Sequence, residues 1–587
     1  MQLSITFKTS AAVTIIAWAS VSQAESRTDL SSAPDRPADL ILSSGHIKTS
    51  SGWAQALAIR RGVIVAVGDV KSVGAFRGPR TRTVELAGAT VLPGLHDVHV
   101  HPMYAGMTER ECKLAQGSNL KETREGVKKC AERARPGEWI VGGQWDAPAL
   151  GGVPNRAMLD EVTGEHPAYL EDTSGHSVWV NSQALALAGI RKDTGNPAGG
   201  IIERDPSGVP TGILRESATD LVHDRIPKPT VEALRSALQW SLEQMLSFGI
   251  TSYTEAAIGF VAGPERELQA YDELADAGGI KQRTILCITW APGSAEDERA
   301  IALRNLHSRK NVSPSCVKIF LDGVPTDSHT AAMLEPYAGT LEGRNDAAAR
   351  YGMLLVKPAT LDAAVTRFDR MGLTVKFHAV GDAAVREGLD AIAAARKANG
   401  FSGLMHNVGH CTFVARSDIP RARAIGATFE VSPYLWGPSP INDSIIQAVG
   451  PELIKRVWPV REMLDAGALV VPGSDWSVVP SVNPWIAVES LVTRQRPGGS
   501  PDSFGKGEAI TLPEALDLFT TRAAEQERMG HLVGRIEVGM LADVIVVDRN
   551  PYAVPITKVH DTKVRMTFIG GEKVFDAARS EAAAPRG

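Results

Sequence analysis

Two histidines separated by one residue, His99 and His101, stand at the end of a short β-prone stretch that begins at Leu95. Alternate residues of a strand point to the same face, so we expect both imidazoles to face one point. Imidazole nitrogens are common ligands of divalent metals, and two that converge can hold such an ion. An HxH pair also occurs by chance on surfaces and in cores, so a metal site needs further ligands from elsewhere in the chain.

Four further residues of metal-ligand type lie in or at the ends of later apolar runs. Lys318 lies in the run 317–323, His378 closes 373–378, His410 ends 404–410 and Asp475 ends 468–475. A single histidine at the end of a strand usually has a structural role. The recurrence of such residues in strand-like runs predicts one shared metal site, made of His99, His101, Lys318, His378, His410 and Asp475.

Strand-like and helix-like segments alternate through the middle of the chain, which is typical of βα units and a parallel sheet. Eight strand-like runs are expected, at 95–101, 249–255, 283–290, 316–322, 373–378, 404–410, 426–431 and 468–475. We therefore predict an α/β chain built on a (β/α)8 TIM barrel, whose active site lies at the carboxyl ends of the strands. The candidate ligands fall at or near such ends, except Lys318, which lies within its run.

The remaining segments predict two additions to the barrel, which we place at 93–530. Residues 104–229 are too long for a βα connection, so we expect an inserted subdomain there, with Trp145 and Trp179 in its core. Short strand-like runs lie at 38–92 and at 531–580, and neither group would make a stable sheet alone. We expect these two ends of the chain to pair into one small β-sandwich domain.

The amino terminus has the pattern of a secretory signal peptide. Lys8 precedes an apolar run at 11–19, and 22–24 offers the small residues that a signal peptidase reads. We predict a signal peptide at 1–24, cleaved after Ala24, and a flexible lead-in at 25–37, so the protein would be periplasmic or secreted. No other stretch is long enough to span a bilayer, so no stable membrane insertion is expected after cleavage. The net charge of -5 gives no reason to expect nucleic acid as a partner.

The five cysteines form neither a CxxC motif nor a zinc-ligand cluster. Cys112 and Cys130 lie in one polar, helix-like stretch and could form a disulfide in an oxidising compartment, although their spacing alone leaves this open. Cys287, Cys316 and Cys411 lie in or beside expected barrel strands. We expect these three to be buried small apolar residues.

The candidate ligands and their local motifs resemble the amidohydrolase superfamily, most closely the large subgroup that contains the N-substituted formamide deformylases. The supporting motifs are GQWD at 143–146, GH at 175–176 with NSQAL at 181–185, VKIFLDG at 317–323, HAVGD at 378–382, and GRIEVG at 534–539 followed by AD at 542–543. The resemblance covers nearly all of the chain after about Ala38. The set of motifs is specific, whereas no single motif is.

The resemblance implies one or two divalent metals. His and carboxylate ligands favour zinc, and manganese, iron or cobalt would also fit. His99, His101 and Asp475 would hold the more buried metal. His378 and His410 would hold the second.

The resemblance also implies catalytic roles. Lys318 would bridge the metals as a carbamate formed with carbon dioxide. A metal-activated hydroxide would attack the substrate carbonyl, and Asp475 would deliver the proton to the leaving nitrogen. His176 would lie on the substrate side of the site.

Two segments depart from the subgroup. Its Arg-His-Arg-Ile-Glu-His, which ends on the strand-6 ligand, here reads Met-His-Asn-Val-Gly-His at 405–410, and its Ser-Arg-Thr-Ala reads Ser-His-Thr-Ala at 328–331. These changes remove charges near the expected mouth and leave the ligands intact. His329 and His406 become candidates for altered substrate contact, against a plain structural role.

We therefore predict a metal-dependent hydrolase that cuts an amide-type C–N bond, other than a peptide bond, in a small-molecule substrate. An esterase or carbamate hydrolase would use the same site. A catalytically inactive binding protein would keep the barrel without its chemistry, and an isomerase or lyase would use the site without water. A homodimer is compatible with the sequence.

Overall fold

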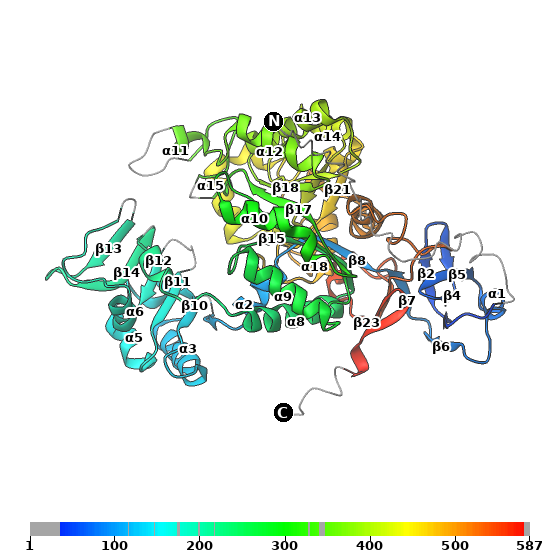
Figure 1. Ribbon diagram of the computed structural model, residues 1–587, viewed down its shortest axis with the longest axis horizontal. Coiled ribbons are helices and arrows are strands. Elements are labelled where there is room, and N and C mark those ends of the chain that lie inside the picture. The colour runs from blue at the N-terminus through cyan, green and yellow to red at the C-terminus, as the bar shows by residue number, and fades with distance from the viewer. Residues whose placement is uncertain are drawn as a thin grey trace, which may run out of the picture.

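The computed structural model describes residues 36–115, 117–145, 147–172, 177–197, 200–216, 218–326, 329–339 and 347–579. The predicted signal peptide lies outside this part of the chain. Within it, no helix has the length and apolar character needed to cross a bilayer. Figure 1 shows a central barrel, with an inserted subdomain on one side and a β-sandwich on the other.

The barrel is one eight-stranded sheet of parallel neighbours, as predicted. Its strands, in chain order, are β8 (Leu95–Val100), β15 (Ile250–Ile258), β16 (Arg283–Thr289), β17 (Val312–Phe320), β18 (Thr374–Ala379), β19 (His406–His410), β20 (Ala427–Val431) and β21 (Leu469–Pro472). Backbone hydrogen bonds between the first strand and the segment after the last close it, from Asp475 N to His99 O (2.7 Å) and from His101 N to Trp476 O (2.8 Å).

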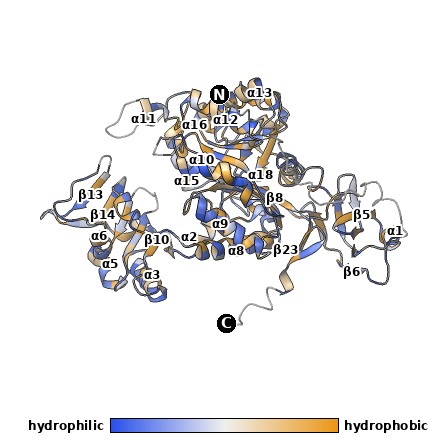
Figure 2. Ribbon diagram, viewed as in Figure 1, coloured by the Kyte–Doolittle hydropathy of each residue, from blue (hydrophilic) through white to orange (hydrophobic). Residues whose placement is uncertain are grey.

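Helices follow the strands of this sheet and surround it, in keeping with the predicted alternation. They include α8 (Val231–Ser247), α9 (Pro264–Asp276), α10 (Ala295–Leu303), α12 (Pro358–Arg370), α13 (Asp382–Asn399), α14 (Ile419–Ile425), α17 (Val460–Asp465) and α18 (Pro484–Thr493). The Thr230 side chain caps α8 by accepting a hydrogen bond from the backbone N–H of Ala233. Hydrophobic residues concentrate on the strands and on the helix faces that cover them (Figure 2), so burial of these faces holds the helices on the sheet.

The β-sandwich is built from both chain ends, as predicted. One sheet has the order β5 (Val63–Gly68), β4 (Ala56–Arg60), β1 (Leu40–Ser43) and β6 (Arg82–Glu85). The other has the order β24 (Glu572–Asp576), β23 (Val564–Ile569), β22 (Val544–Val547), β7 (Thr90–Pro93), β2 (His46–Thr49) and β3 (Gly52–Ala54). In it, Val91 pairs with Val546, so the N-terminal and C-terminal strands share one ladder. Leu42, Leu57 and Phe568 belong to a single core between the sheets.

The segment between β8 and α8 contains a six-stranded sheet. Its order is β13 (Gly200–Arg204), β14 (Pro210–Glu216), β12 (Ser177–Val180), β11 (Ala168–Asp172), β10 (Ile140–Trp145) and β9 (Cys112–Lys113). Helices α3 (Leu120–Arg133), α5 (Arg156–Thr163) and α6 (Ser182–Leu187) accompany it. Trp145 and Trp179 are buried together in its core, as expected, with ring centroids 6.3 Å apart.

Two disulfides occur in the described part of the chain. Cys112 and Cys130 are bonded and tie β9 to α3, so the pairing that their spacing left open is present. Cys287 and Cys316 are also bonded, which corrects the expectation that both are unbonded apolar residues. The register of β16 and β17 places these two residues directly opposite each other, and sequence spacing does not reveal that register. Cys411 is free and buried, as expected.

Candidate metal centre

The six predicted ligands converge at the carboxyl ends of the barrel strands. His99 lies near the end of β8 and His101 directly follows it, and His378 and His410 lie at the ends of β18 and β19. Asp475 follows β21, and Lys318 lies two residues before the end of β17. In Figure 1, β8 runs from the β-sandwich toward the insert, so these strand ends face the insert.

Three of the six offer ligand atoms that all lie within 4.8 Å of one another, namely His99, His101 and Asp475. Oδ1 of Asp475 lies 3.3 Å from Nε2 of His101 and 3.5 Å from Nε2 of His99. Its other oxygen, Oδ2, lies 4.0 Å from Nδ1 of His410. The carboxylate therefore contacts imidazoles from both of the predicted ligand groups.

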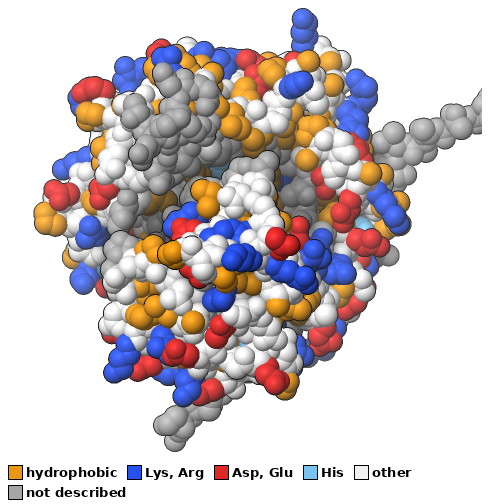
Figure 3. All heavy atoms as spheres, turned by 90° about the vertical axis from the view of Figure 1, so that its left-hand side faces the viewer, with side chains coloured by type: hydrophobic (Ala, Val, Ile, Leu, Met, Phe, Trp, Pro, Cys, Tyr) orange, Lys and Arg blue, Asp and Glu red, His pale blue; other side chains and the backbone are white. Residues whose placement is uncertain are grey.

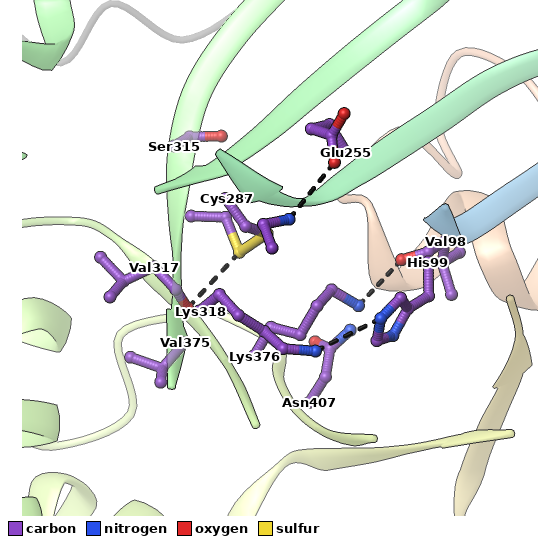
Figure 4. Close-up of a disulfide and its surroundings, with 12 residues drawn as sticks. Val98, His99, Glu255, Cys287, Ser315, Val317, Lys318, Val375, Lys376 and Asn407 are labelled. Carbon is purple, nitrogen blue, oxygen red and sulfur yellow. Dashed lines mark hydrogen bonds between the residues drawn. A yellow bond between two sulfur atoms is a disulfide. The ribbon is translucent and has the colours of Figure 1, made fainter. Parts of the chain in front are cut away.

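The remaining ligands complete a continuous cluster around this group. Nζ of Lys318 lies 3.3 Å from Nε2 of His99, and Figure 4 shows the lysine pointing from β17 toward that ring. The His410 ring centroid lies 4.9 Å from that of His99 and 4.4 Å from that of His378. The Cys287–Cys316 disulfide lies beside the stem of Lys318 in the same view.

The backbone around the ligands is unusual for residues that carry a side chain. His410 has a φ of 71° and Asp475 a φ of 60°, in the left-handed region that non-glycine residues rarely adopt. Such strain costs about 1–3 kcal/mol per residue and concentrates at functional sites. Gly473 lies where a Cβ atom would come within 2.3 Å of the Cβ of His99, so only glycine allows the first and last strands to approach this closely.

Burial keeps three of the imidazoles neutral. It lowers the pKa of His378 to about 4 and that of His410 to about 3, and it lowers the pKa of His99 well below its ordinary value. A neutral imidazole has a free nitrogen lone pair, which is the form that binds a metal. These side chains are therefore in the protonation state that a ligand requires.

The other three ligands respond to the charges around them. Burial alone would lower the pKa of His101, but the Asp475 and Glu255 carboxylates, which accept hydrogen bonds from the protonated ring, outweigh it and raise that pKa to about 9. Burial alone would also raise the pKa of Asp475, but His101, His410 and His99 hold it far below its usual range. Burial lowers the pKa of Lys318 to about 8. The cluster thus contains the ionised carboxylate of Asp475 and the amine of Lys318, which loses its proton at a lower pH than an ordinary lysine.

Two carboxylates that were not predicted from the sequence orient His99 and His101. Nδ1 of His99 contacts the Glu430 carboxylate, which also pairs with the buried Lys376 and accepts a hydrogen bond from Asn407 at 3.2 Å. Nδ1 of His101 lies 3.4 Å from Oε1 of Glu255. A carboxylate on the far nitrogen fixes the tautomer and ring orientation of a metal-binding histidine. The sequence signal that could have revealed these two carboxylates was that each is the single acidic residue of a buried strand, β20 or β15.

Asp322, four residues after Lys318, connects two of the loops at this end of the barrel. Its carboxylate accepts hydrogen bonds from the backbone N–H groups of Ala332 (3.0 Å), Val380 (3.0 Å) and Gly381 (2.8 Å). Burial raises its pKa to about 7. It therefore ties together the loops that follow β17 and β18, beside His378, whose Nε2 lies 3.9 Å away.

The three further candidate histidines have different outcomes. His176 lies outside the described residues, so its substrate-side role stays a prediction. His406 lies at the opposite end of β19 from His410, where it accepts a hydrogen bond from Val375 N (2.9 Å) and contacts Asp369 (3.0 Å), which gives it a structural role. His329 is buried and stacks on Tyr337 at 4.2 Å between ring centroids, which gives it a packing role.

Comparisons with known proteins agree with this geometry. The sequence profile of the amidohydrolase family matches residues 82–575. The protein LONG AFTER FAR-RED 3 of Arabidopsis thaliana is 30% identical over 554 residues, which cover 92% of each chain. The N-substituted formamide deformylase of Arthrobacter pascens is 28% identical over 559 residues, covering 91% of this chain and 97% of the relative. The crystal structure of an uncharacterized metal-dependent hydrolase from Pyrococcus furiosus has a TM-score of 0.69 at 25% identity, covering 87% of this chain and 99% of that one.

Proposed function

The chain belongs to the amidohydrolase family, as the resemblance predicted, and from that membership we propose that it is a metal-dependent hydrolase of an amide-type C–N bond. The observation that carries the proposal is the convergence of the His99, His101 and Asp475 ligand atoms within 4.8 Å of one another. Lys318, His378 and His410 surround them, so the donor set is intact.

The residues present fit a divalent metal, and zinc suits their chemistry best. His99, His101 and Asp475 would hold one ion through two imidazole nitrogens and a carboxylate, which is a common zinc-binding set. Lys318, His378 and His410 would extend the site to a second ion. When bound, such a metal acts as a Lewis acid that polarises a carbonyl and lowers the pKa of water toward neutrality. The neutral imidazoles of His99, His378 and His410 and the ionised Asp475 carboxylate support this assignment, and His101 would release its proton when a metal binds.

Lys318 is suited to carboxylation. With its pKa lowered to about 8, about a tenth of the amine is unprotonated at pH 7, far more than for an ordinary lysine. The free amine would add to the carbon of carbon dioxide and lose a proton, which leaves a carbamate with two oxygen donors. That change converts a cation beside His99 into an anionic ligand.

Asp475 would carry the proton during hydrolysis. Its carboxylate is ionised and within 3.3–4.0 Å of three imidazoles, so it can accept a proton from the attacking water at a free lone pair. The same carboxyl group would then donate this proton to the departing nitrogen, because the two steps are sequential. Ester and carbamate bonds are within reach of the same chemistry, whereas an inactive binding protein would have had no reason to keep this donor set.

We also propose that the protein is exported. The Cys112–Cys130 and Cys287–Cys316 disulfides support this, since such bonds form and persist in oxidising compartments. The amino-terminal signal pattern is the second argument. A homodimer stays a prediction.

Metal analysis combined with a substrate panel tests the proposed activity. The purified chain is assayed for bound metals, treated with a chelator, and offered N-formyl amides, N-acyl amides and matched esters before and after metal is restored. We expect about stoichiometric metal, loss of hydrolysis on chelation and its recovery with zinc. A metal-free protein that hydrolyses nothing would instead be a binding protein, and activity that survives full metal removal would contradict a metal-dependent mechanism.

A further inference from the structure

An exposed aromatic ring lies beside a metal ligand at the carboxyl end of the second barrel strand. Phe260 follows β15 and is 52% exposed. Its ring centroid lies 5.9 Å from that of His101, with the two planes 29° apart, and 5.4 Å from that of Tyr104, which it meets edge-on. One face of the predicted metal site is therefore aromatic and open to solvent.

The short loop that presents this ring is firmly held. The buried carboxylate of Glu267 accepts hydrogen bonds from the backbone N–H groups of Gly259 (2.7 Å), Val261 (2.7 Å) and Ala262 (2.6 Å). These bonds flank Phe260 on both sides, so its backbone is fixed although its side chain is exposed. A large apolar side chain held rigidly in solvent lowers the entropic cost of binding a ligand against it.

The described residues that directly follow the barrel strands include neither Arg nor Lys. These residues are 101–107, 259–263, 290–294, 321–326 with 329–334, 380–381, 411–415, 432–439 and 473–483. Basic residues occur farther along, such as Arg350 and Lys357 after β17 and Arg416 after β19. Enzymes that bind carboxylate or phosphate groups place Arg or Lys against them. The residues nearest to the strand ends therefore supply no cation to hold an anionic group beside the candidate ligands.

Two further apolar side chains are exposed in the same set of loops. Val324 follows β17 and is 44% exposed, and Val478 follows β21 and is 62% exposed. Figure 3 views the molecule from the side of the insert, which the strand ends face, and the surface there is hollowed between insert and barrel. Exposed apolar residues in a concave region are typical of ligand-binding surfaces.

We propose that Phe260 is the specificity-determining wall of the substrate site and selects uncharged substrates that carry an aromatic or other apolar group next to the scissile bond. Glu267 is the positioning residue that fixes this wall. A preference measured as kcat/KM rests on the proposed hydrolase function. A preference measured as ligand affinity does not, because binding can be measured without turnover.

Matched ligands that differ only in one carboxylate test the proposal. Acetanilide and 4-acetamidobenzoate share an amide and a ring, and phenyl acetate and 4-acetoxybenzoate are the corresponding esters. Binding of the amide pair is measured by calorimetry on the metal-loaded protein, and hydrolysis of both pairs by kcat/KM. We expect the neutral member to bind roughly tenfold tighter, and Phe260→Ala to remove that advantage.

The control variant is Phe401→Ala, which removes a 67% exposed phenylalanine that precedes β19, at the opposite end of the barrel. It should leave the preference unchanged. Glu267→Gln should reduce the preference in part, and the double variant Phe260→Ala with Glu267→Gln should be no worse than Phe260→Ala alone, because Glu267 acts through Phe260.

The outcomes separate this proposal from the hydrolase function. Tight, Phe260-dependent binding of the neutral amide without hydrolysis would support the wall and count against the activity. Hydrolysis with no preference between matched pairs, or no binding of either amide, would overturn the wall. An equal loss of affinity for both members in Phe260→Ala would show a structural role and would also overturn it.

Discussion

Nε2 of His101 lies 3.3 Å from Oδ1 of Asp475, a contact that joins the first strand of the barrel to the loop after its last strand. Backbone hydrogen bonds run beside it, since His101 N donates to Trp476 O and Asp475 N donates to His99 O. The contacts that close the sheet therefore also bring the candidate ligands of its first and last strands together. A sheet that failed to close would separate the two halves of the site.

The first prediction concerns Asp475 itself. Asp475→Asn should keep the fold and lower turnover by about 10²–10⁴-fold, because an amide cannot accept and return a proton. Turnover is expressed per bound metal, measured on the same sample, so that any loss of metal is separated from the loss of the proton carrier. Asp465→Asn, at an exposed aspartate of α17, is the matched control. Near-normal turnover per metal in Asp475→Asn would remove this residue as the proton carrier.

Lys318 makes a second prediction, about metal content. Lys318→Ala should lower the amount of bound metal and the activity together, because the variant lacks the amine that becomes the bridging carbamate. Short carboxylic acids such as acetate should restore part of the activity by supplying the missing carboxylate. Lys310→Ala, at an exposed lysine just before β17, should change neither quantity. Full metal and full activity in Lys318→Ala would show that Lys318 is not a ligand.

The two disulfides together determine how many cysteine thiols should react before and after reduction. In denaturant without reductant, one thiol per chain should react, that of Cys411, and reduction should raise the count to five. Peptide mapping should link Cys287 to Cys316. Loss of this bond in Cys287→Ala with Cys316→Ala should lower stability by about 3–4 kcal/mol. Five reactive thiols before reduction would contradict both bonds.

The barrel and the convergence of the candidate ligands could be predicted because each candidate belongs to a local pattern. Apolar runs that end in His or Asp mark strands whose carboxyl ends meet in a barrel, and neither feature needs knowledge of register. All eight predicted strands are present, and the six ligands meet. What the runs do not reveal is which residues of neighbouring strands face each other.

The missed features all depend on that pairing. Glu430 and Glu255 orient histidines on other strands, and a lone carboxylate in an apolar run does not say which ring it will meet. Cys287 and Cys316 are opposite only in the observed register. His406 and His410 belong to one strand, yet they lie at opposite ends of the barrel, so of the two roles considered for His406 the structure supports the structural one over substrate contact.

His406 predicts a pH dependence of stability. Its Nδ1 accepts a hydrogen bond from Val375 N, and burial lowers its pKa below the ordinary 6.5. Below pH 6.5 the unfolded chain therefore binds a proton here that the folded chain does not, so stability falls as pH falls through this value. His406→Gln should reduce this slope by up to about 1.4 kcal/mol per pH unit. Unfolding is followed between pH 5 and 8, and His531→Gln, at an exposed histidine, should keep the wild-type slope.

Glu430 makes the last prediction, because it serves two partners at once. It contacts Nδ1 of His99 and also pairs with the buried Lys376, so Glu430→Gln should weaken metal binding about 10–100-fold and also destabilise the fold. The double variant Glu430→Gln with Lys376→Met removes the unpaired buried charge. It should recover thermal stability but not metal affinity, because His99 still lacks its carboxylate.

Glu489, buried on α18, pairs with the half-buried His560 of the segment between β22 and β23, and this pair gives the control for this experiment. Oε2 of Glu489 lies 2.7 Å from Nδ1 of His560, away from the ligands, so Glu489→Gln should lower the melting temperature without changing metal affinity. Affinity is measured by titration of the metal-free protein in a competing chelator. If Glu430→Gln bound metal as tightly as the wild type, the carboxylate would be a partner of Lys376 alone. If the double variant recovered both quantities, the metal effect of Glu430→Gln would follow from charge imbalance and not from the loss of His99 orientation.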